Sequence, residues 1–255
     1  WSKTNFMSMK TNDKRTAFIL AAGLGTRLKE LTSDRPKALV ELNGKPLLKI
    51  VIDNLISQNF NHFVINIHHH GDKIIDYFKN KKYENVIIEI SDERDILLDT
   101  GGAILKALPY FKDSKAVLIH NVDIITDIDF QSVYDNFINT EDAAWLLTQN
   151  RNNKRKIVFD ENDNFIGRMN LETNVFDGDT DLKEEFKLLS FSGLHIIKPE
   201  HFNDFELRKC YVFELYKEIA KRDKVKSKFI QPNYWFDLGT QEQLKEASSW
   251  LLSQK

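Results

Sequence analysis

Two glycines and two cations near the start of the chain have the residue types and spacing that phosphate binding requires. Gly23 and Gly25 end an apolar run, Arg27 follows them, and Lys37 stands directly after a proline. Glycine lets the backbone turn tightly and approach a ligand closely, and successive N–H groups in such a turn form a concavity suited to phosphate. Arg27 adds a fork of charged donors. The stretch 17–39 therefore predicts a polyphosphate site, with surface ion pairs for both cations as the alternative.

Two carboxylates further along the chain have the chemistry of a metal site. Asp123 comes just after the apolar run 116–119, and Asp237 lies in the segment 234–240, YWFDLGT. Mg²⁺ binds through one or two carboxylates together with phosphates and water, rather than through a full protein cage. The alternatives are structural: a helix cap or turn residue for Asp123, and the N-cap of the last helix for Asp237. The three aromatic residues before Asp237 are expected in the core, with one ring able to border the pocket.

The elements that must position these groups alternate in type through the first 150 residues. Apolar runs predict strands at 17–22, 63–67, 86–90, 116–119 and 143–147. Helical spacing of apolar residues predicts helices at 46–59, 74–78, 100–108 and 133–138, the third ended by a proline. This alternation predicts a Rossmann-like, doubly wound, mostly parallel mixed sheet in a three-layer α/β/α arrangement. Ligands of such sheets bind beyond the carboxyl ends of the strands, where the glycine loop falls.

The pattern changes after residue 150. Two short strands, 156–159 and 164–167, flank the turn 160–163, and a polar excursion spans 170–185. A strand at 188–197 carries Gly193 in its middle, which often marks a close backbone approach, and helices are predicted at 212–221 and 241–252. We expect residues 15–255 to form a single domain, with a first half (15–150) that carries the glycine loop and a second half (151–255) that walls the pocket.

Composition limits the partners. The net charge of −2 gives no reason to expect nucleic acid or an anionic membrane as partner. Cys210 is the only cysteine, which excludes an intrachain disulfide and fits a reducing, cytoplasmic setting. No apolar run approaches the roughly 18 residues of a membrane span, and no secretory signal is visible. Residues 1–14 are expected to be a disordered lead-in or an expression remnant. His68, His69 and His70 point in alternating directions, so we expect one to line a loop rather than all three to bind one ion.

The glycine loop departs from two common phosphate-binding patterns. It has neither the third glycine of the dinucleotide fingerprint nor the lysine followed by Ser or Thr that closes a Walker loop. It closely resembles the signature of the sugar-1-phosphate nucleotidyltransferases (nucleotide-sugar pyrophosphorylases): a strand, a Gly-x-Gly-Thr-Arg-Leu loop and then a Pro-Lys pair. The resemblance extends over residues 15–252. It is greatest to the short bacterial branch that includes N-acetylmuramate 1-phosphate uridylyltransferase and mannose-1-phosphate guanylyltransferase-like chains.

The resemblance implies a Mg²⁺-dependent transferase that joins a nucleoside triphosphate to a sugar 1-phosphate and releases pyrophosphate, in nucleotide-sugar biosynthesis for the cell envelope. It implies that Arg27 holds the leaving pyrophosphate, that Lys37 holds the phosphates in flight, and that Asp123 and Asp237 bind the metal. The implied nucleotide contacts are Leu20, Ala21, Ala22, Gly23, Gly25, Thr26, Glu93, Thr100, Gly101 and Gly102.

The chain departs from the family pattern at several positions. Val122 stands where glycine commonly precedes the first metal carboxylate, and Asp99 replaces the first glycine of the base-binding turn. Glu93 can accept a hydrogen bond from a base, with one charge on a solvated loop as the alternative. No space remains after Lys255 for the β-helix of longer relatives, so no acyltransferase module is expected.

The resemblance makes residues 15–150 the nucleotide-binding half and residues 151–255 the sugar-binding half, and the sugar side carries the weakest signal. The Glu-Lys-Pro segment that contacts the sugar phosphate in many relatives is absent. A cation at Arg155, Lys156 or Arg168 is expected to replace it, and the hydroxyls of the sugar are expected at Asn170, Glu172, Ser192 or Gly193. The sequence specifies neither the base nor the sugar, and it does not distinguish a monomer from a homo-oligomer.

Three alternatives remain open. Phosphocholine cytidylyltransferases share the glycine loop. A glycosyltransferase would use an Asp-x-Asp metal motif, which Asp127-Ile128-Asp129 matches, but it leaves the glycine loop and Lys37 without a role. A non-catalytic nucleotide-sugar sensor would keep the pocket and lose a metal carboxylate or a phosphate cation, and no such loss is evident.

Overall fold

The computed structural model describes residues 14–79, 81, 83–179 and 185–254, so nearly all of the predicted lead-in lies outside the described residues. The described strands form a ten-stranded mixed sheet, in which β11-β10-β9-β12-β6-β1-β4-β5 form one path and β8 joins both β12 and β13. Its strands are β1 (Thr16–Leu20), β4 (His62–Ile67), β5 (Ile87–Asp92), β6 (Val117–Asn121), β8 (Ala144–Gln149), β9 (Arg155–Phe159), β10 (Phe165–Asn170), β11 (Val175–Gly178), β12 (Lys187–Ile197) and β13 (Val225–Phe229).

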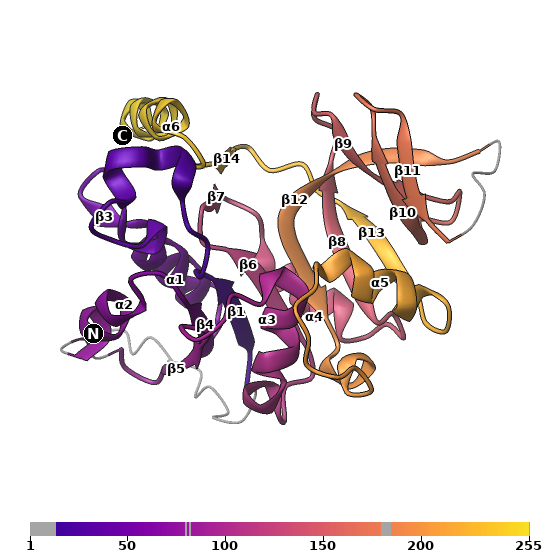
Figure 1. The fold of residues 1–255 in the computed structure, drawn as a ribbon, viewed down its shortest axis with the longest axis horizontal. Helices are drawn as coiled ribbons and strands as arrows, with labels where there is room; N and C mark the ends of the chain where they lie inside the picture. The colour runs from indigo at the N-terminus through magenta and orange to yellow at the C-terminus, as the bar shows by residue number, and fades with distance from the viewer. Residues whose placement is uncertain (1–13, 80, 82, 180–184, 255) are drawn as a thin grey trace, which may run out of the picture.

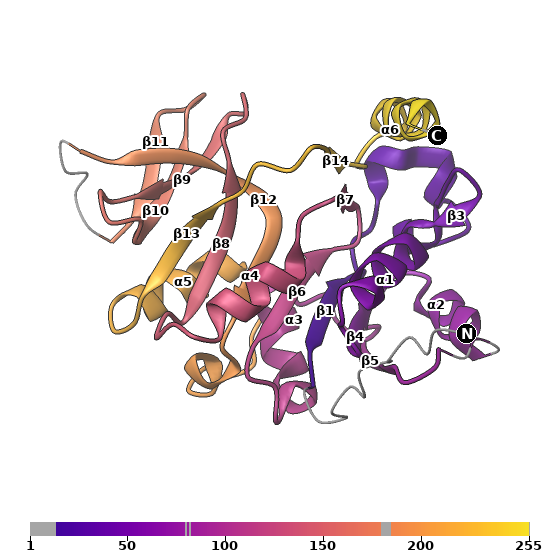
Figure 2. The same ribbon diagram turned by 180° about the vertical axis from the view of Figure 1, so that it is seen from behind.

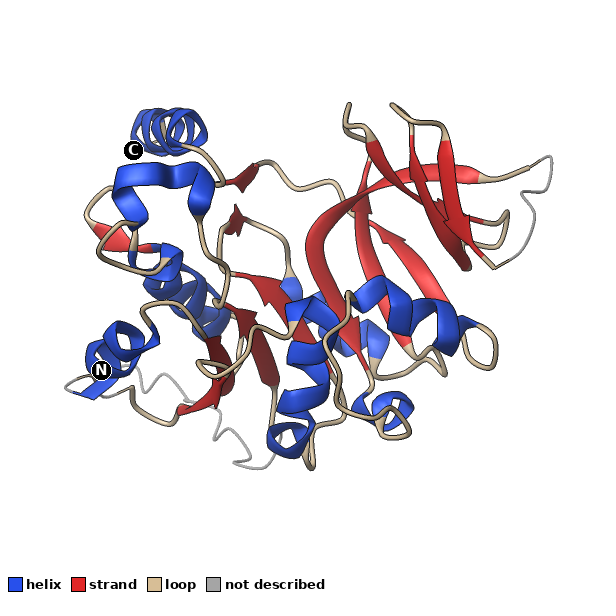
Figure 3. Cartoon of the chain, in the orientation of Figure 1, coloured by secondary structure: helices blue, strands red, loops and turns tan. Residues whose placement is uncertain are grey.

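Helices and short elements complete the described chain (Figure 3). The α-helices are α1 (Leu47–Ser57), α2 (Gly71–Lys79), α3 (Asp99–Ala107), α4 (Phe130–Phe137), α5 (Val212–Ala220) and α6 (Gln241–Ser253). The 3₁₀ helices are η1 (Thr26–Thr32), η2 (Lys37–Leu39), η3 (Leu108–Phe111) and η4 (Pro199–Phe202). Two small two-stranded sheets complete the fold: a hairpin of β2 (Glu41–Leu42) and β3 (Lys45–Pro46), and a long-range antiparallel pair of β7 (Ile124–Thr126) and β14 (Trp235–Asp237). No helix in the described ranges is long and apolar enough to cross a membrane.

The sheet has a parallel part and an antiparallel part. β6, β1, β4 and β5 run parallel, as the continuous apolar runs predicted, because strands covered on both faces need no polar alternation. β12 then pairs antiparallel with β6, β8 and β9, which joins the second half of the chain to the first through one long strand. The predicted Rossmann-like, mostly parallel mixed fold is confirmed.

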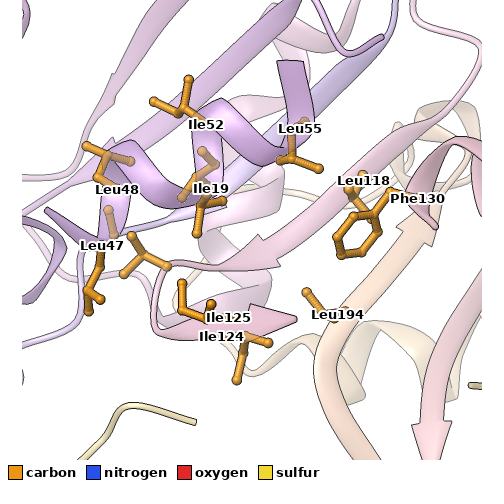
Figure 4. Packing of buried hydrophobic residues seen from close by; sticks show 14 of the residues in the cluster. Ile19, Leu47, Leu48, Ile52, Leu55, Leu118, Ile124, Ile125, Phe130 and Leu194 are labelled. Atoms are coloured by element: carbon orange, nitrogen blue, oxygen red, sulfur yellow. The ribbon is translucent and has the colours of Figure 1, made fainter. Parts of the chain in front are cut away.

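Helices cover both faces of the sheet (Figures 1 and 2). α3 and α5 lie on one face, where Phe18 and Ile104 pack with Tyr216. α1 and α4 lie on the other, and Figure 4 shows Leu48 and Ile52 of α1 beside Ile19 of β1. Both apolar clusters include residues from before and after residue 150, so the two halves share their cores.

The end of the chain returns to its beginning. In Figures 1 and 2 the last segment crosses from β13 to β14 and places α6 beside the β2–β3 hairpin. Ser248 of α6 donates a hydrogen bond to Asn43 in that hairpin, and Gln241 donates to the Leu28 carbonyl in η1 at 3.2 Å. This return carries Asp237 back to the glycine loop.

The structure corrects several sequence-based boundaries. The polar excursion 170–185 contains β11. The side chains of this strand are exposed or half-buried, so a search for apolar runs does not find it. The strands β7, β13 and β14 were not predicted, since three to five residues carry little periodicity. β1 ends at Leu20 rather than at residue 22, and the proline at 109 lies inside η3 after α3 has ended.

Candidate active site

The glycine loop turns where β1 ends. Gly25 adopts φ +63°, and its carbonyl accepts hydrogen bonds from the Leu28 amide at 2.9 Å and the Thr32 hydroxyl at 3.1 Å. A Cβ on Gly25 would lie 3.0 Å from Thr32 Cγ2 and 3.2 Å from Lys37 Cβ, whereas a Cβ on Gly23 would meet no atom within 4 Å. Gly25 therefore sets the path of the backbone against Lys37, and Gly23 faces open space.

Lys37 and Asp123 form an ion pair under this loop. Lys37 is 8% exposed, and its Nζ donates to Asp123 Oδ2. Pro36 is extended (φ −69°, ψ 153°) and fixes the entry to η2, which carries the lysine. Asp123 lies between β6 and β7, so it caps no helix. An ion pair was the alternative to phosphate binding for Lys37. The structure shows such a pair, and its carboxylate is Asp123, the predicted metal ligand.

The β7–β14 ladder brings Asp237 to Asp123. Asp237 lies opposite Ile124 in the antiparallel register, and the Leu238 amide donates to the Asp123 carbonyl at 2.9 Å. Burial and the neighbouring Asp123 raise the pKa of the Asp237 carboxyl, against the opposing effects of Lys37, Arg27 and Arg151. Asp237 is not the N-cap of α6, because Thr240 fills that position and its hydroxyl accepts from the Gln243 amide.

One oxygen of Asp237 has no hydrogen-bond partner among the described residues. This atom, Oδ1, is buried, and a buried carboxylate oxygen ordinarily accepts a hydrogen bond. An unpaired, charged oxygen beside a second carboxylate is the donor set that a divalent cation would complete. No group of three or more His, Cys, Asp and Glu side chains in the described ranges is placed to hold a metal without further ligands. The two aspartates fit a cation whose remaining ligands come from phosphate and water.

Arg27 lies over the segment that carries Asp237. A Cβ on Gly239 would lie 2.9 Å from the Nη2 atom of Arg27, so the guanidinium packs against backbone that only glycine leaves open. Arg27 is exposed and makes no ion pair within 4 Å in the described part of the chain. Its charge is therefore available to a ligand.

These groups line a pocket of about 410 Å³. Its walls include predicted residues from the glycine loop, the predicted Thr100, both predicted cations and Asp123, together with Leu24, Asn121, Val122 and Gly239, which the sequence analysis missed. Each missed residue lies within two positions of a predicted one, so proximity in the sequence was the signal that could have found them. The predicted lining residues are Leu20, Ala21, Gly23, Gly25, Thr26, Arg27, Lys37, Thr100 and Asp123.

Glu93 lies behind the loop rather than on a solvated one. It is 0% exposed, and its carboxylate accepts hydrogen bonds from Asn66 Nδ2 at 2.9 Å and the Leu98 amide at 3.4 Å. Burial raises its pKa. The Asn66 side-chain oxygen in turn accepts from the amides of Ala21, at 2.6 Å, and Ala22. The solvated-loop alternative for Glu93 is wrong, and a contact with a base remains a prediction; Asn66, which ties Glu93 to the loop, was missed.

Gly101 and Gly102 do not line the pocket. Both amides donate to the Cys210 carbonyl, at 2.9 and 3.2 Å, and a Cβ on Gly102 would lie 2.4 Å from the Arg208 carbonyl oxygen. The structure therefore explains these glycines by the close packing of α3 on the 208–211 segment. Asp99 precedes them with φ +58°, a conformation that glycine adopts without strain and that aspartate tolerates.

The predicted sugar-side residues divide into two groups. Ser192 is buried and donates to the Leu147 carbonyl at 2.7 Å, and Gly193 adopts φ +82° with Asn121 Nδ2 only 3.0 Å from where its Cβ would lie. Glu172 instead pairs with Lys154 on the surface, and Asn170 accepts from the Glu172 amide at 3.0 Å. Ser192 and Gly193 therefore adjoin the pocket lining, whereas Asn170 and Glu172 stabilise the β10–β11 turn.

Three further groups have structural contacts. Asp129 is the N-cap of α4, and Asp127 accepts from Asn233 Nδ2 at 2.7 Å, so both carboxylates of the Asp-x-Asp segment are engaged within the protein. His68 donates to the Glu93 carbonyl at 2.6 Å and lines that loop, as predicted for one of the three histidines. Trp235 donates from its indole to the Ser192 carbonyl at 3.0 Å, and none of the three aromatic residues before Asp237 lines the pocket among the described residues.

The sequence pattern described as nucleotidyl transferase matches residues 16–163, more than half of the chain. This protein belongs to the nucleotidyl transferase family. Nucleotidyltransferases of this family generally use a divalent metal, in keeping with the paired carboxylates. The family assignment drawn from the glycine loop and the Pro-Lys pair is confirmed.

By their names, the relatives of this nucleotidyltransferase transfer different nucleotides. The chain is 30% identical over 229 residues (89% of this chain, 95% of the relative) to D-glycero-alpha-D-manno-heptose 1-phosphate guanylyltransferase of Campylobacter jejuni. It is 40% identical over 113 residues to N-acetylmuramate alpha-1-phosphate uridylyltransferase of Caulobacter vibrioides, a match that spans 44% of this chain and less than half (46%) of that relative. The crystal structure of HddC from Yersinia pseudotuberculosis complexed with GMP-PN shares the fold, with a TM-score of 0.72 at 20% identity over 93% of this chain and 99% of that one.

Proposed function

We propose that this nucleotidyltransferase joins a nucleoside triphosphate to a sugar 1-phosphate, giving a nucleotide-sugar and pyrophosphate. The observation that carries the proposal is the convergence of the Lys37–Asp123 pair with the unpaired oxygen of Asp237 beside the glycine-loop pocket. The guanylyltransferase and uridylyltransferase relatives act on sugar 1-phosphates by name, which supports the acceptor class.

The reaction brings two polyanions together, so the protein mainly positions them and neutralises charge. An oxygen of the sugar phosphate forms a bond to the α-phosphorus, and the bond from that phosphorus to the bridging oxygen of the β-phosphate breaks. The electron pair leaves with pyrophosphate. Arg27, an exposed residue of the pocket lining, would hold this leaving group, and the buried Lys37 would hold the transferred phosphoryl oxygens.

Asp123 and Asp237 are the residues that would hold Mg²⁺. When bound, the ion would neutralise phosphate oxygens and fix their orientation. Two carboxylates suffice for this ion, because it takes its other ligands from phosphate and water. The attacking phosphate is already ionised near neutral pH, so the mechanism requires no general base, and none of the histidines has a role in it.

Pyrophosphate release tests the proposal. We would combine four nucleoside triphosphates with a panel of sugar 1-phosphates and phosphocholine, with Mg²⁺, and measure pyrophosphate. Release with one clear pair is expected, and Asp123→Ala should abolish it while the variant stays folded. Release with phosphocholine alone would replace the sugar by that acceptor. No release by a folded protein that binds a triphosphate would overturn the proposal in favour of a sensor.

A further inference from the structure

Two cations of the second half, one buried and one half-buried, touch no carboxylate within 4 Å among the described residues. Lys156 is 8% exposed, and its Nζ donates to Ser190 Oγ at 3.0 Å and to the Arg151 carbonyl. Arg151 is half-buried, and neither residue makes an ion pair within 4 Å among the described residues. Burial lowers the pKa of both side chains. A buried or half-buried cation that touches no carboxylate directly is costly, which suggests an anionic ligand between these cations and the carboxylates of the site.

The guanidinium of Arg151 is held in one orientation. It lies 3.9 Å from the centroid of the Trp235 ring, and its Nη2 donates to the Phe191 carbonyl. The ring is fixed in turn by the bond from its indole to the Ser192 carbonyl. The buried Nε atom has no hydrogen-bond partner in the part of the chain that the structure describes, so the guanidinium has an unused donor. A planar, pre-oriented fork with an unused donor suits phosphate recognition.

The stacking on Trp235 places this fork beside β14, the strand that ends at Asp237. Trp235, on which the guanidinium stacks, lies two residues before Asp237 in β14. Arg27 and Lys37 approach the carboxylates from the glycine loop, and Arg151 approaches from the segment between β8 and β9. The paired aspartates thus have cations on the glycine-loop side and on the side of the second half.

We propose that Arg151 binds the phosphate of the sugar 1-phosphate, and that Lys156 is a positioning residue that holds the Arg151 backbone. This inference rests on the proposed function, in which the acceptor phosphate must meet the triphosphate at the metal carboxylates. It assigns the cation that the absent Glu-Lys-Pro segment leaves unaccounted for. Of the cations predicted from sequence, Arg155 is exposed and Arg168 stacks on Phe213, with its guanidinium 5.0 Å from that ring.

The test compares Arg151→Gln and Arg151→Lys with the matched control Arg155→Gln, which removes the same charge from an exposed position nearby. With the substrate pair that the wild type uses, Arg151→Gln should lower kcat/KM for the sugar phosphate about 10- to 100-fold, the loss typical of a charged hydrogen bond. The KM for the triphosphate should change less than about twofold, and Arg151→Lys should recover part of the loss. Inhibition by inorganic phosphate, competitive with the acceptor, should weaken in parallel.

Two outcomes would overturn the inference. One is an unchanged acceptor KM in Arg151→Gln; the other is equal damage to both substrates together with a lowered melting temperature, which would mean that Arg151 only supports Trp235. Binding of glucose 1-phosphate, mannose 1-phosphate and N-acetylglucosamine 1-phosphate by calorimetry needs no turnover. If the wild type releases no pyrophosphate, the proposed function fails; loss of sugar-phosphate binding in Arg151→Gln alone would still support the subsite, and equal binding by both proteins would overturn it.

Discussion

The glycine-loop side of the candidate site and the proposed acceptor side beside it are built in different ways around the same pair of aspartates. On the glycine-loop side, Gly25, Arg27 and Lys37 lie within a short stretch, and local turns place them. On the other side, Arg151, Ser192 and Trp235 come from three distant segments, and long-range contacts between them fix the geometry. The first side is therefore a motif in the sequence, whereas the second exists only in the fold.

The difference matters for how the site is completed. Asp123 belongs to the first side through its ion pair with Lys37, but Asp237 reaches it only because β14 pairs with β7. The backbone bond from Leu238 to the Asp123 carbonyl joins the two sides directly. We infer that binding of the triphosphate and binding of the sugar phosphate both depend on Asp237.

The largest predicted effect tests that shared point. Asp237→Asn keeps the shape of the side chain and removes its charge, so it should lower kcat by about 10³-fold or more, because several kcal/mol of metal-assisted charge stabilisation would be lost. Steady-state kinetics with both substrates varied, and a Mg²⁺ titration at each, would measure it. We expect a higher Mg²⁺ requirement on both sides rather than a change confined to one substrate.

Asp127→Asn is the matched control for this variant. Asp127 lies near β14 and bonds Asn233, but it does not line the pocket. It should keep activity within about threefold, as for most substitutions away from a site. A loss in Asp127→Asn as severe as that in Asp237→Asn would favour the glycosyltransferase alternative, in which the Asp-x-Asp segment holds the metal.

The sequence predicted the first side closely because its signals are local. The apolar run before Gly23 becomes β1, and the lining residues of the loop follow the order of the chain. Helices were also placed well, since the periods that define α1 and α5 are long enough to count. Asp123 could be singled out because an apolar run in the sequence marks where a strand ends, and Asp123 stands just after that end.

The second side escaped prediction for a physical reason. Nothing near Arg151 in the sequence distinguishes it from Arg155, and only the stacking on Trp235, more than 80 positions away, separates them. Glu93 and Asn66 show the same limit, because their carboxylate–amide bond joins adjacent parallel strands across 27 positions. The Gly101–Gly102 pair was assigned to the nucleotide from the family pattern, whereas the contact that requires it is with the 208–211 segment.

A predicted effect of intermediate size, the pH dependence of stability, tests whether the two sides unfold together. Burial lowers the pKa of His120 in β6 to about 4 and that of His195 in β12 to about 3. In the unfolded chain both titrate near 6.5, so below that pH the unfolded state binds more protons and stability falls until the folded pKa is reached. For His120 the difference between 6.5 and about 4 corresponds to about 3 kcal/mol at pH 4.

Denaturant unfolding between pH 7 and pH 4 would measure this loss. Because β12 pairs directly with β6, we expect one transition that weakens as a whole. His195→Gln, which can still bond Tyr216, should flatten the pH dependence of that single transition. Two separate transitions, with only one responding to His195→Gln, would show that the sides are independent units.

The smallest effects come from glycines that serve the two sides differently. Gly25 on the first side and Gly193 on the second both have positive φ, and a Cβ on either would lie 3.0 Å from its nearest neighbour. Alanine at either position should cost about 1–2 kcal/mol of stability, the strain of a left-handed residue. Gly25→Ala should also lower kcat, because the new methyl group presses on Lys37.

Gly23→Ala tests the space left for the ligand without adding backbone strain. Its Cβ would meet no protein atom within 4 Å, so the melting temperature should stay unchanged. The methyl group would instead enter the space that the loop leaves for phosphate, and the KM for the triphosphate should rise about tenfold with the acceptor KM unaffected, since a displaced phosphate contact costs roughly 1.4 kcal/mol. Thermal melts and initial rates on the three variants would measure both quantities. If Gly23→Ala raised the acceptor KM instead, the open space beside Gly23 would belong to the sugar phosphate, and the division of the pocket into two sides would have to be reversed.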